Sequence, residues 1–83
     1  MNLYLISQDV NHEYDTYDSA VVCCVSAGVA RLIHPNGHSV WDDGVWDDGG
    51  TWCDDLAQVH VALIGTADAS LRPGVICASY NAG

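Results

Sequence analysis

Hydrophobic residues gather in four short runs, which are separated by polar segments rich in turn-forming residues. The run 20–25 (AVVCCV) is continuous and rich in valine, which predicts a central strand covered on both faces. Three further segments have the length and composition of strands: 3–8, 58–65 and 75–80. The stretch 9–19 is polar and predicts a loop between the first two strands.

One short helix is predicted between the second and third strands, over residues 27–34. Ser26 is a typical N-cap, and the Pro-Asn-Gly sequence of 35–37 ends the helix. Three apolar residues fall on one face at helical spacing: Val29, Leu32 and Ile33. The order β-β-α-β-β predicts an α+β fold, with a mostly antiparallel four-stranded sheet and one short helix packed on a face. A length of 83 residues fits a single domain, 1–83.

The segment 38–55 has a composition of its own. The pentapeptide VWDDG occurs twice without a gap, at 40–44 and 45–49, and 50–55 is an imperfect third copy. All three tryptophans and six of the eleven acidic residues of the chain lie here. A five-residue unit is too short for a solenoid repeat, so the pattern indicates a local duplication.

The charge balance is strongly acidic. Eleven acidic residues face two basic ones, Arg31 and Arg72, and the net charge is −9. Nucleic acids and anionic membranes both attract basic proteins, so direct binding to either is disfavoured. A basic surface on a protein partner fits this charge instead. The chain has no apolar run of membrane-spanning length, and its N-terminus lacks the basic flank of a signal peptide, which indicates a cytoplasmic protein.

The acidic, tryptophan-containing segment is the candidate partner-binding site. Tryptophan is enriched among the residues that dominate binding energy at interfaces, and paired aspartates supply the charge. The predicted contact residues are Trp41, Asp42, Asp43, Trp46, Asp47, Asp48, Asp54 and Asp55. Two alternatives remain open: the tryptophan rings fix a glycine-rich loop to the sheet while the aspartates point to water, or the loop holds a cation.

No catalytic residue, metal site or cofactor is predicted. The adjacent aspartates lack the alternating ligands and the late glutamate of a calcium loop. The four cysteines are scattered without the paired spacing of a zinc site, and reduced thiols with a structural role are expected. Cys53 is followed by Asp54 and Asp55, whose charge raises the pKa of a thiol and disfavours a nucleophile. The histidines are expected at the surface or rim.

Several segments resemble a group of small uncharacterised phage and prophage proteins: 3–8 (LYLISQ), 14–22 (YDTYDSAVV), 31–35 (RLIHP) and 74–83 (GVICASYNAG). In size and acidity the chain also resembles anti-CRISPR proteins. The resemblance implies an inhibitor in the host cytoplasm that docks on a basic, nucleic-acid-binding surface of a host defence complex, such as a CRISPR–Cas effector. The alternatives are a phage accessory or structural module that binds through its sheet, or a small enzyme or metal protein. A homodimer stays open.

Overall fold

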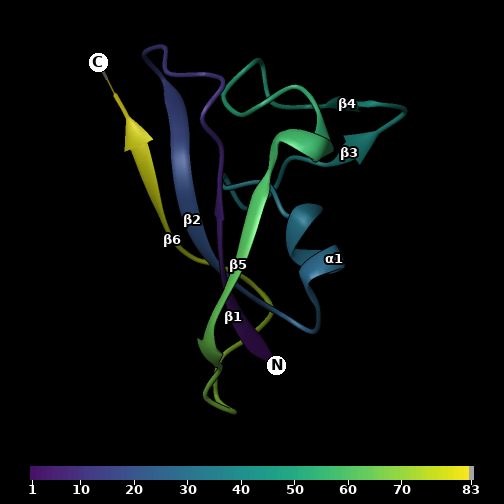
Figure 1. Ribbon diagram of the computed structural model, residues 1–83, viewed down its shortest axis with the longest axis vertical. Helices are drawn as coiled ribbons and strands as arrows, with labels where there is room; N and C mark the ends of the chain where they lie inside the picture. Colours follow the sequence, from purple (N-terminus) through teal and green to yellow (C-terminus); the bar gives the residue numbers. More distant parts are fainter. Residues whose placement is uncertain (83) are drawn as a thin grey trace.

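Four antiparallel strands form one sheet in the order β5-β1-β2-β6 in the computed structural model, which describes residues 1–82 (Figure 1). The strands are β1 (Asn2–Ser7), β2 (Thr16–Cys24), β5 (His60–Thr66) and β6 (Gly74–Asn81). One short helix, α1 (Ala27–Arg31), follows β2. The connection from α1 to β5 carries a two-stranded hairpin, β3 (Trp41–Asp42) and β4 (Val45–Trp46), and a 3-10 helix, η1 (Leu56–Gln58).

This architecture confirms the predicted α+β fold with one antiparallel four-stranded sheet and one short helix. The largest difference in the strand bounds is that β2 begins at Thr16, inside the segment predicted as a loop. The early start has a physical reason, because Thr16 and Tyr17 pair with Asn81 and Tyr80 at the far end of β6. That pairing between distant segments has no signal in the local pattern.

The core lies between one face of the sheet and the long connection 32–59. The sheet contributes alternate side chains of its two inner strands, among them Tyr4, Ile6 and Val22. The covering layer combines a single helical residue with four from the connection: Ala30, Trp46, Trp52, Cys53 and Val59. The prediction that 20–25 is covered on both faces is only partly correct. Ala20, Val22 and Cys24 face the core and Cys23 is also closed to solvent, but Val21 is half-buried and Val25 is 69% exposed. Among residues 1–82, no helix is long and apolar enough to cross a membrane.

The helix is shorter than predicted. Ser26 is its N-cap as expected, because its Oγ accepts the backbone N–H of Val29 over 3.2 Å. The last helical residue is Arg31, whose guanidinium donates to the carbonyls of Leu56 and Val59. Leu32 therefore lies beyond the last turn and is 51% exposed, and the predicted apolar face does not form. The residue that α1 buries is Ala30.

Candidate functional site

The first copy of the duplicated pentapeptide supplies a strand and a tight turn. In the hairpin, Trp41 lies opposite Trp46, and Asp42 lies opposite Val45. The two turn residues, Asp43 and Gly44, have positive φ values of 51° and 81°. This conformation fits a type I′ turn, for which Asp-Gly is a preferred sequence. The aspartates of the first copy are therefore presented at the tip of a hairpin.

The second copy has the same sequence but a different environment. Trp46 is buried, and its ring packs edge-on against that of Trp41 at a centroid distance of 5.4 Å. Asp47 is exposed, while the side chain of Asp48 is only 6% exposed. The two identical pentapeptides thus have different structural roles. The first forms the tip of the hairpin, and the second packs the hairpin against the core.

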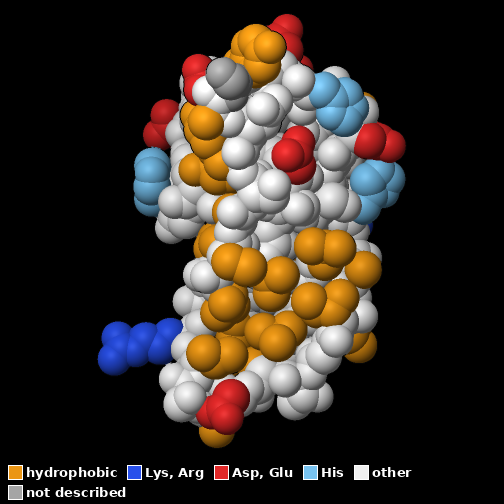
Figure 2. Space-filling model, turned by 90° about the vertical axis from the view of Figure 1, so that its left-hand side faces the viewer, with side chains coloured by type: hydrophobic (Ala, Val, Ile, Leu, Met, Phe, Trp, Pro, Cys, Tyr) orange, Lys and Arg blue, Asp and Glu red, His pale blue; other side chains and the backbone are white. Residues whose placement is uncertain are grey.

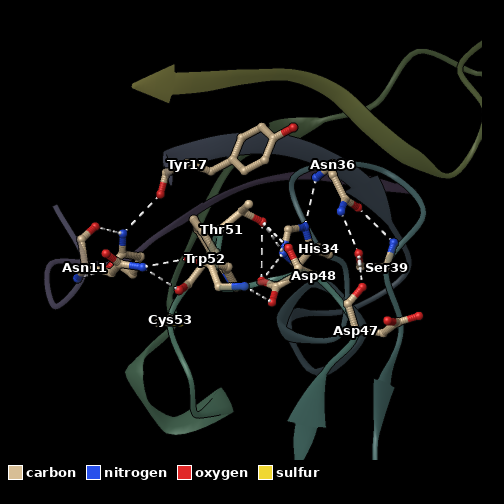
Figure 3. A network of polar contacts seen from close by, with 12 residues as sticks. Asn11, Tyr17, His34, Asn36, Ser39, Asp47, Asp48, Thr51, Trp52 and Cys53 are labelled. Atoms are coloured by element: carbon tan, nitrogen blue, oxygen red, sulfur yellow. Dashed lines mark hydrogen bonds and ion pairs between the residues drawn. The ribbon is translucent and has the colours of Figure 1, made fainter. Parts of the chain in front are cut away.

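Asp48 meets a buried histidine. Its Oδ2 lies 2.7 Å from Nε2 of His34, whose side chain is closed to solvent (Figure 3). Three aromatic rings surround the imidazole: Trp46, Tyr17 and Trp52, at centroid distances of 5.1, 5.9 and 6.2 Å. The expectation that the histidines lie at the surface is therefore wrong for this residue.

The hydrogen bonds fix the protonation of this pair. The backbone N–H of Asn36 donates to Nδ1 of His34 over 3.0 Å, so Nε2 carries the proton that is donated to Asp48. Burial lowers the pKa of His34, although Asp48 opposes this shift. Burial alone would raise the pKa of Asp48, but the backbone N–H of Gly50 and the imidazole of His34 lower it below its ordinary value. A neutral histidine and a charged aspartate follow, and neither is accessible to a substrate.

Backbone and amide hydrogen bonds join the two connections at this end of the molecule. The carboxamide of Gln8 holds the first connection, since its Oε1 accepts the N–H groups of Val10 and Asn11 and its Nε2 donates to the carbonyl of Asn11. Asn11 in turn donates from Nδ2 to the carbonyls of Gly50 and Trp52, at 3.1 and 3.0 Å (Figure 3). The first connection, 8–15, is thereby fixed against the segment 39–55.

Most of the negative charge lies in these two segments, which we call the acidic end (8–15 and 39–55). It contains nine of the eleven acidic residues: Asp9, Glu13, Asp15, Asp42, Asp43, Asp47, Asp48, Asp54 and Asp55. The remaining two are Asp18, early in β2, and Asp68, in the β5–β6 connection at the opposite end. Within residues 1–82 no carboxylate forms an ion pair with an arginine; the two ion pairs are with His34 and His60. The charge is thus concentrated and not neutralised.

Three hollows lie at the acidic end, and two of them are candidate contacts for a partner. One, of about 400 Å³, lies on the hairpin and combines apolar Val40, Trp41 and Val45 with Asp42 and Asp47. The other, of about 310 Å³, separates Glu13 of the first connection from Asp54, with Trp52 and Cys53 in its lining. Burial raises the pKa of Cys53 to about 11, so this thiol is a poor nucleophile. Both hollows suit a cationic side chain with an aliphatic stem.

The structure brings the predicted contact residues together but removes two of them from the surface. Asp42, Asp43, Asp47, Asp54 and Asp55 are exposed, and Trp41 is half-buried. The prediction that Trp46 and Asp48 contact a partner is corrected, because Trp46 packs in the core and Asp48 faces His34. The alternative role for tryptophan, fixing a loop to the sheet, describes Trp46 and Trp52.

Sequence reasoning missed the residues that shape this end. Gln8 and Asn11 lie at the boundary of a predicted strand and a loop, where a polar residue carries no distinctive pattern. His34 follows the apolar pair Leu32-Ile33 and precedes Pro35, and this apolar flank is the one available sign of its burial.

No family model, curated protein or solved structure matches the chain. Its function is therefore inferred from the charge and geometry of the molecule itself.

Proposed function

We propose that this protein binds a basic surface of another protein through its acidic end. In line with the phage resemblance, the partner would be a host defence complex, such as a CRISPR–Cas effector, and the protein would inhibit it by occupying a nucleic-acid-binding surface. The observation that carries the proposal is the concentration of nine acidic residues in two joined segments without a neutralising arginine.

The exposed carboxylates are free to meet a partner. Within residues 1–82, the side chains of Asp42, Asp43, Asp47 and Asp54 make no hydrogen bond or ion pair. Carboxylates fixed on one rigid surface raise the rate of association with a positively charged partner by long-range attraction. Such a surface competes with the phosphates that the partner normally holds.

Apolar contact would supplement this attraction at the hairpin. Trp41 is half-buried, and Val40 and Val45 are each 62% exposed beside it. An apolar centre bordered by Asp42 and Asp47 matches an arginine or lysine, whose stem is apolar and whose head is charged. Trp41 and the two valines would fix the partner after the charges have guided it.

The test compares two variants with equal net charge. Asp43→Asn/Asp47→Asn removes two charges from the hairpin and keeps the turn, because asparagine tolerates the positive φ of residue 43. Asp18→Asn/Asp68→Asn removes two charges outside the hairpin. Immobilised wild-type protein and both variants are exposed to a lysate of the bacterial host at about 0.05 and 0.3 M salt, and retained proteins are identified.

A basic nucleic-acid-binding protein should be retained at low salt, and duplex DNA added in excess should displace it. Retention should fall by about tenfold with the hairpin variant and by less than twofold with the control, since two direct charge contacts contribute about 1.4 kcal/mol together. Equal retention by the two variants, or a partner that DNA leaves in place, contradicts the proposal.

A further inference from the structure

The face of the sheet that α1 leaves uncovered is apolar. The strand register places Leu5 opposite Val21 and Ala62, and Val21 opposite Cys77, so these four side chains form a row across the sheet. Leu5 lies between the buried residues Tyr4 and Ile6, so its row faces away from the core. Hydrophobic side chains gather in this region, with acidic residues and histidines above them and an acidic and a basic side chain at the lower margin (Figure 2).

Two further apolar residues extend the row. The register shifts between Leu3 and Tyr4 and between Val21 and Val22, which places Ile64 and Ile76 at irregular positions beside it. Ile64 is 52% exposed and Ile76 is 44% exposed. We call the set the open face: Leu5, Val21, Ala62, Ile64, Ile76 and Cys77.

Charged residues are nearly absent from these strands. β1, β5 and β6 contain no Asp, Glu, Lys or Arg, and β2 contains only Asp18. The chain has a net charge of −9, so its charged residues lie almost entirely in the connections and not in the strands of the sheet. A contiguous apolar area on a soluble domain typically marks an interaction site.

We propose that the open face packs against the open face of a second copy of this chain. Two flat sheets pack face to face about 10 Å apart, and a two-fold axis makes one apolar face complementary to itself. The product is a two-layer β-sandwich with α1 and the connection 32–59 on each outer side. This inference does not depend on the proposed function.

The charge distribution selects one of the two possible orientations. If the two-fold axis ran along the strands, both acidic ends would meet and repel each other. With the axis running across the strands, the acidic ends lie at opposite ends of a molecule whose long dimension is 35 Å. That separation exceeds the Debye length of about 8 Å at physiological salt, so the repulsion is screened.

The same orientation provides an attraction. Arg72 is exposed in the β5–β6 connection, at the end of the sheet opposite the acidic end (Figure 1). In the antiparallel dimer this end lies beside the acidic end of the other copy. The connection 32–59 lies on the outer side of the dimer, so each Arg72 approaches only the carboxylates of the partner's first connection, Asp9, Glu13 and Asp15. The attraction is partly offset by Asp68, which shares the connection of Arg72, and it occurs twice by symmetry.

The area indicates a weak dimer. Four strands spaced by about 4.8 Å, with about six residues each, give roughly 400 Å² of flat area per copy. Specific interfaces of standard size bury about 800 Å² of accessible surface per partner. The open face is thus about half the standard size, in the class of weak and transient interfaces, and we expect a dissociation constant no tighter than the order of micromolar.

The test is sedimentation equilibrium on the whole chain, from about 1 µM to about 500 µM, on both sides of the expected dissociation constant. The average mass of wild-type protein should rise from the monomer mass of 8.9 kDa towards twice that value. Ala62→Glu and Leu5→Asp each place a charge on the open face and should weaken association at least tenfold. Val45→Asp is the matched control, since it charges an exposed apolar residue on the hairpin.

Circular dichroism identifies any variant that fails to fold. If Leu5→Asp fails to fold, Ala62→Glu still tests the proposal, because Ala62 is exposed on the edge strand β5. Arg72→Glu should weaken association more than Arg72→Gln does. A chain that stays monomeric at about 500 µM overturns the proposal. A dimer that survives both open-face variants also overturns it, and equal effects of the two Arg72 variants overturn the antiparallel arrangement.

Discussion

The imidazole of His34 donates a hydrogen bond to the carboxylate of Asp48 over 2.7 Å, and the structure closes both side chains to solvent. Since Nδ1 of His34 already accepts the N–H of Asn36, a second proton on the ring would break that hydrogen bond. The pair therefore links the segment after α1 to the segment after β4 only while His34 is neutral and Asp48 is charged. Stability should depend on pH as a result.

Acidification should destabilise the fold in two steps. Burial lowers the pKa of His34 below its ordinary value of 6.5, so the unfolded chain takes up a proton here before the folded chain does. As the pH falls below 6.5, the free energy of unfolding therefore decreases, by at most about 1.4 kcal/mol per pH unit. The lowered pKa of Asp48 has the same sign, but its contribution is lost only as the pH falls below 3.8.

The variant His34→Gln isolates the first step, because glutamine offers an N–H to Asp48 but does not titrate. We expect its free energy of unfolding, measured in urea, to change less than that of the wild type between about pH 7.5 and pH 5.5. At the upper pH the variant should be the less stable protein, since an amide fills the aromatic surroundings less well. Parallel curves for the two proteins would show that His34 is not the titrating group.

The hairpin turn makes a second prediction about stability. At Gly44, φ is +81° and an added Cβ would meet no atom within 4 Å, so Gly44→Ala introduces backbone strain without a clash. We expect a loss of about 1 kcal/mol in the free energy of unfolding. Gly28→Ala is the control with the opposite sign, because it replaces a helical glycine where the new Cβ would lie 3.9 Å from Ser26 Oγ. That change should stabilise by roughly 0.5–1 kcal/mol, and a gain from Gly44→Ala would contradict the turn.

The order of strands and helix was predictable because each depends on a local pattern. The runs 3–8 and 20–25 have strand length and composition, and Ser26 is a capping residue at the start of a helical segment. The helix end was harder to place. Leu32 and Ile33 continue the helical spacing, but a helix this short is held by packing, and Arg31 turns towards Leu56 and Val59.

The site was predictable in its composition but not in its geometry. Both copies of VWDDG have the same local preference, yet Trp41 is only half-buried and Asp43 is exposed, while Trp46 is buried in the core and Asp48 faces His34. What separates the copies is the position of His34, fourteen residues before Asp48 in the chain and buried among rings from β2, β4 and the loop after it. Tertiary contacts of this kind leave no trace in a short repeat.

The neighbouring aspartates Asp54 and Asp55 should differ in their effect on stability. Asp55 caps η1, since its Oδ1 accepts the N–H of Ala57 over 2.9 Å and its own N–H donates to Gln58 Oε1 over 3.2 Å. Asp55→Ala should therefore lower the free energy of unfolding by about 1 kcal/mol. Asp54→Ala removes the same charge from an exposed residue and should change it by less than about 0.5 kcal/mol. Equal losses in chemical denaturation would mean that charge, and not the cap, determines the effect.

Thiol reactivity should separate one cysteine from the other three. Cys77 is exposed on β6, whereas Cys23, Cys24 and Cys53 are buried, and all four thiols are free. Burial also raises the pKa of Cys53 to about 11, so little of the reactive thiolate forms at this residue near neutral pH.

A disulfide reagent added at about pH 8 to the dilute folded protein should therefore modify one thiol per chain within minutes, and all four after unfolding. Cys77→Ser should abolish the fast reaction, while Cys53→Ser should leave it unchanged. A fast reaction that persists in Cys77→Ser would mean that one of the buried thiols is reached by local opening. Adding Cys53→Ser to that variant would then distinguish a loosely held connection 32–59 from a loosely held sheet, because Cys53 belongs to the connection and Cys23 and Cys24 belong to β2.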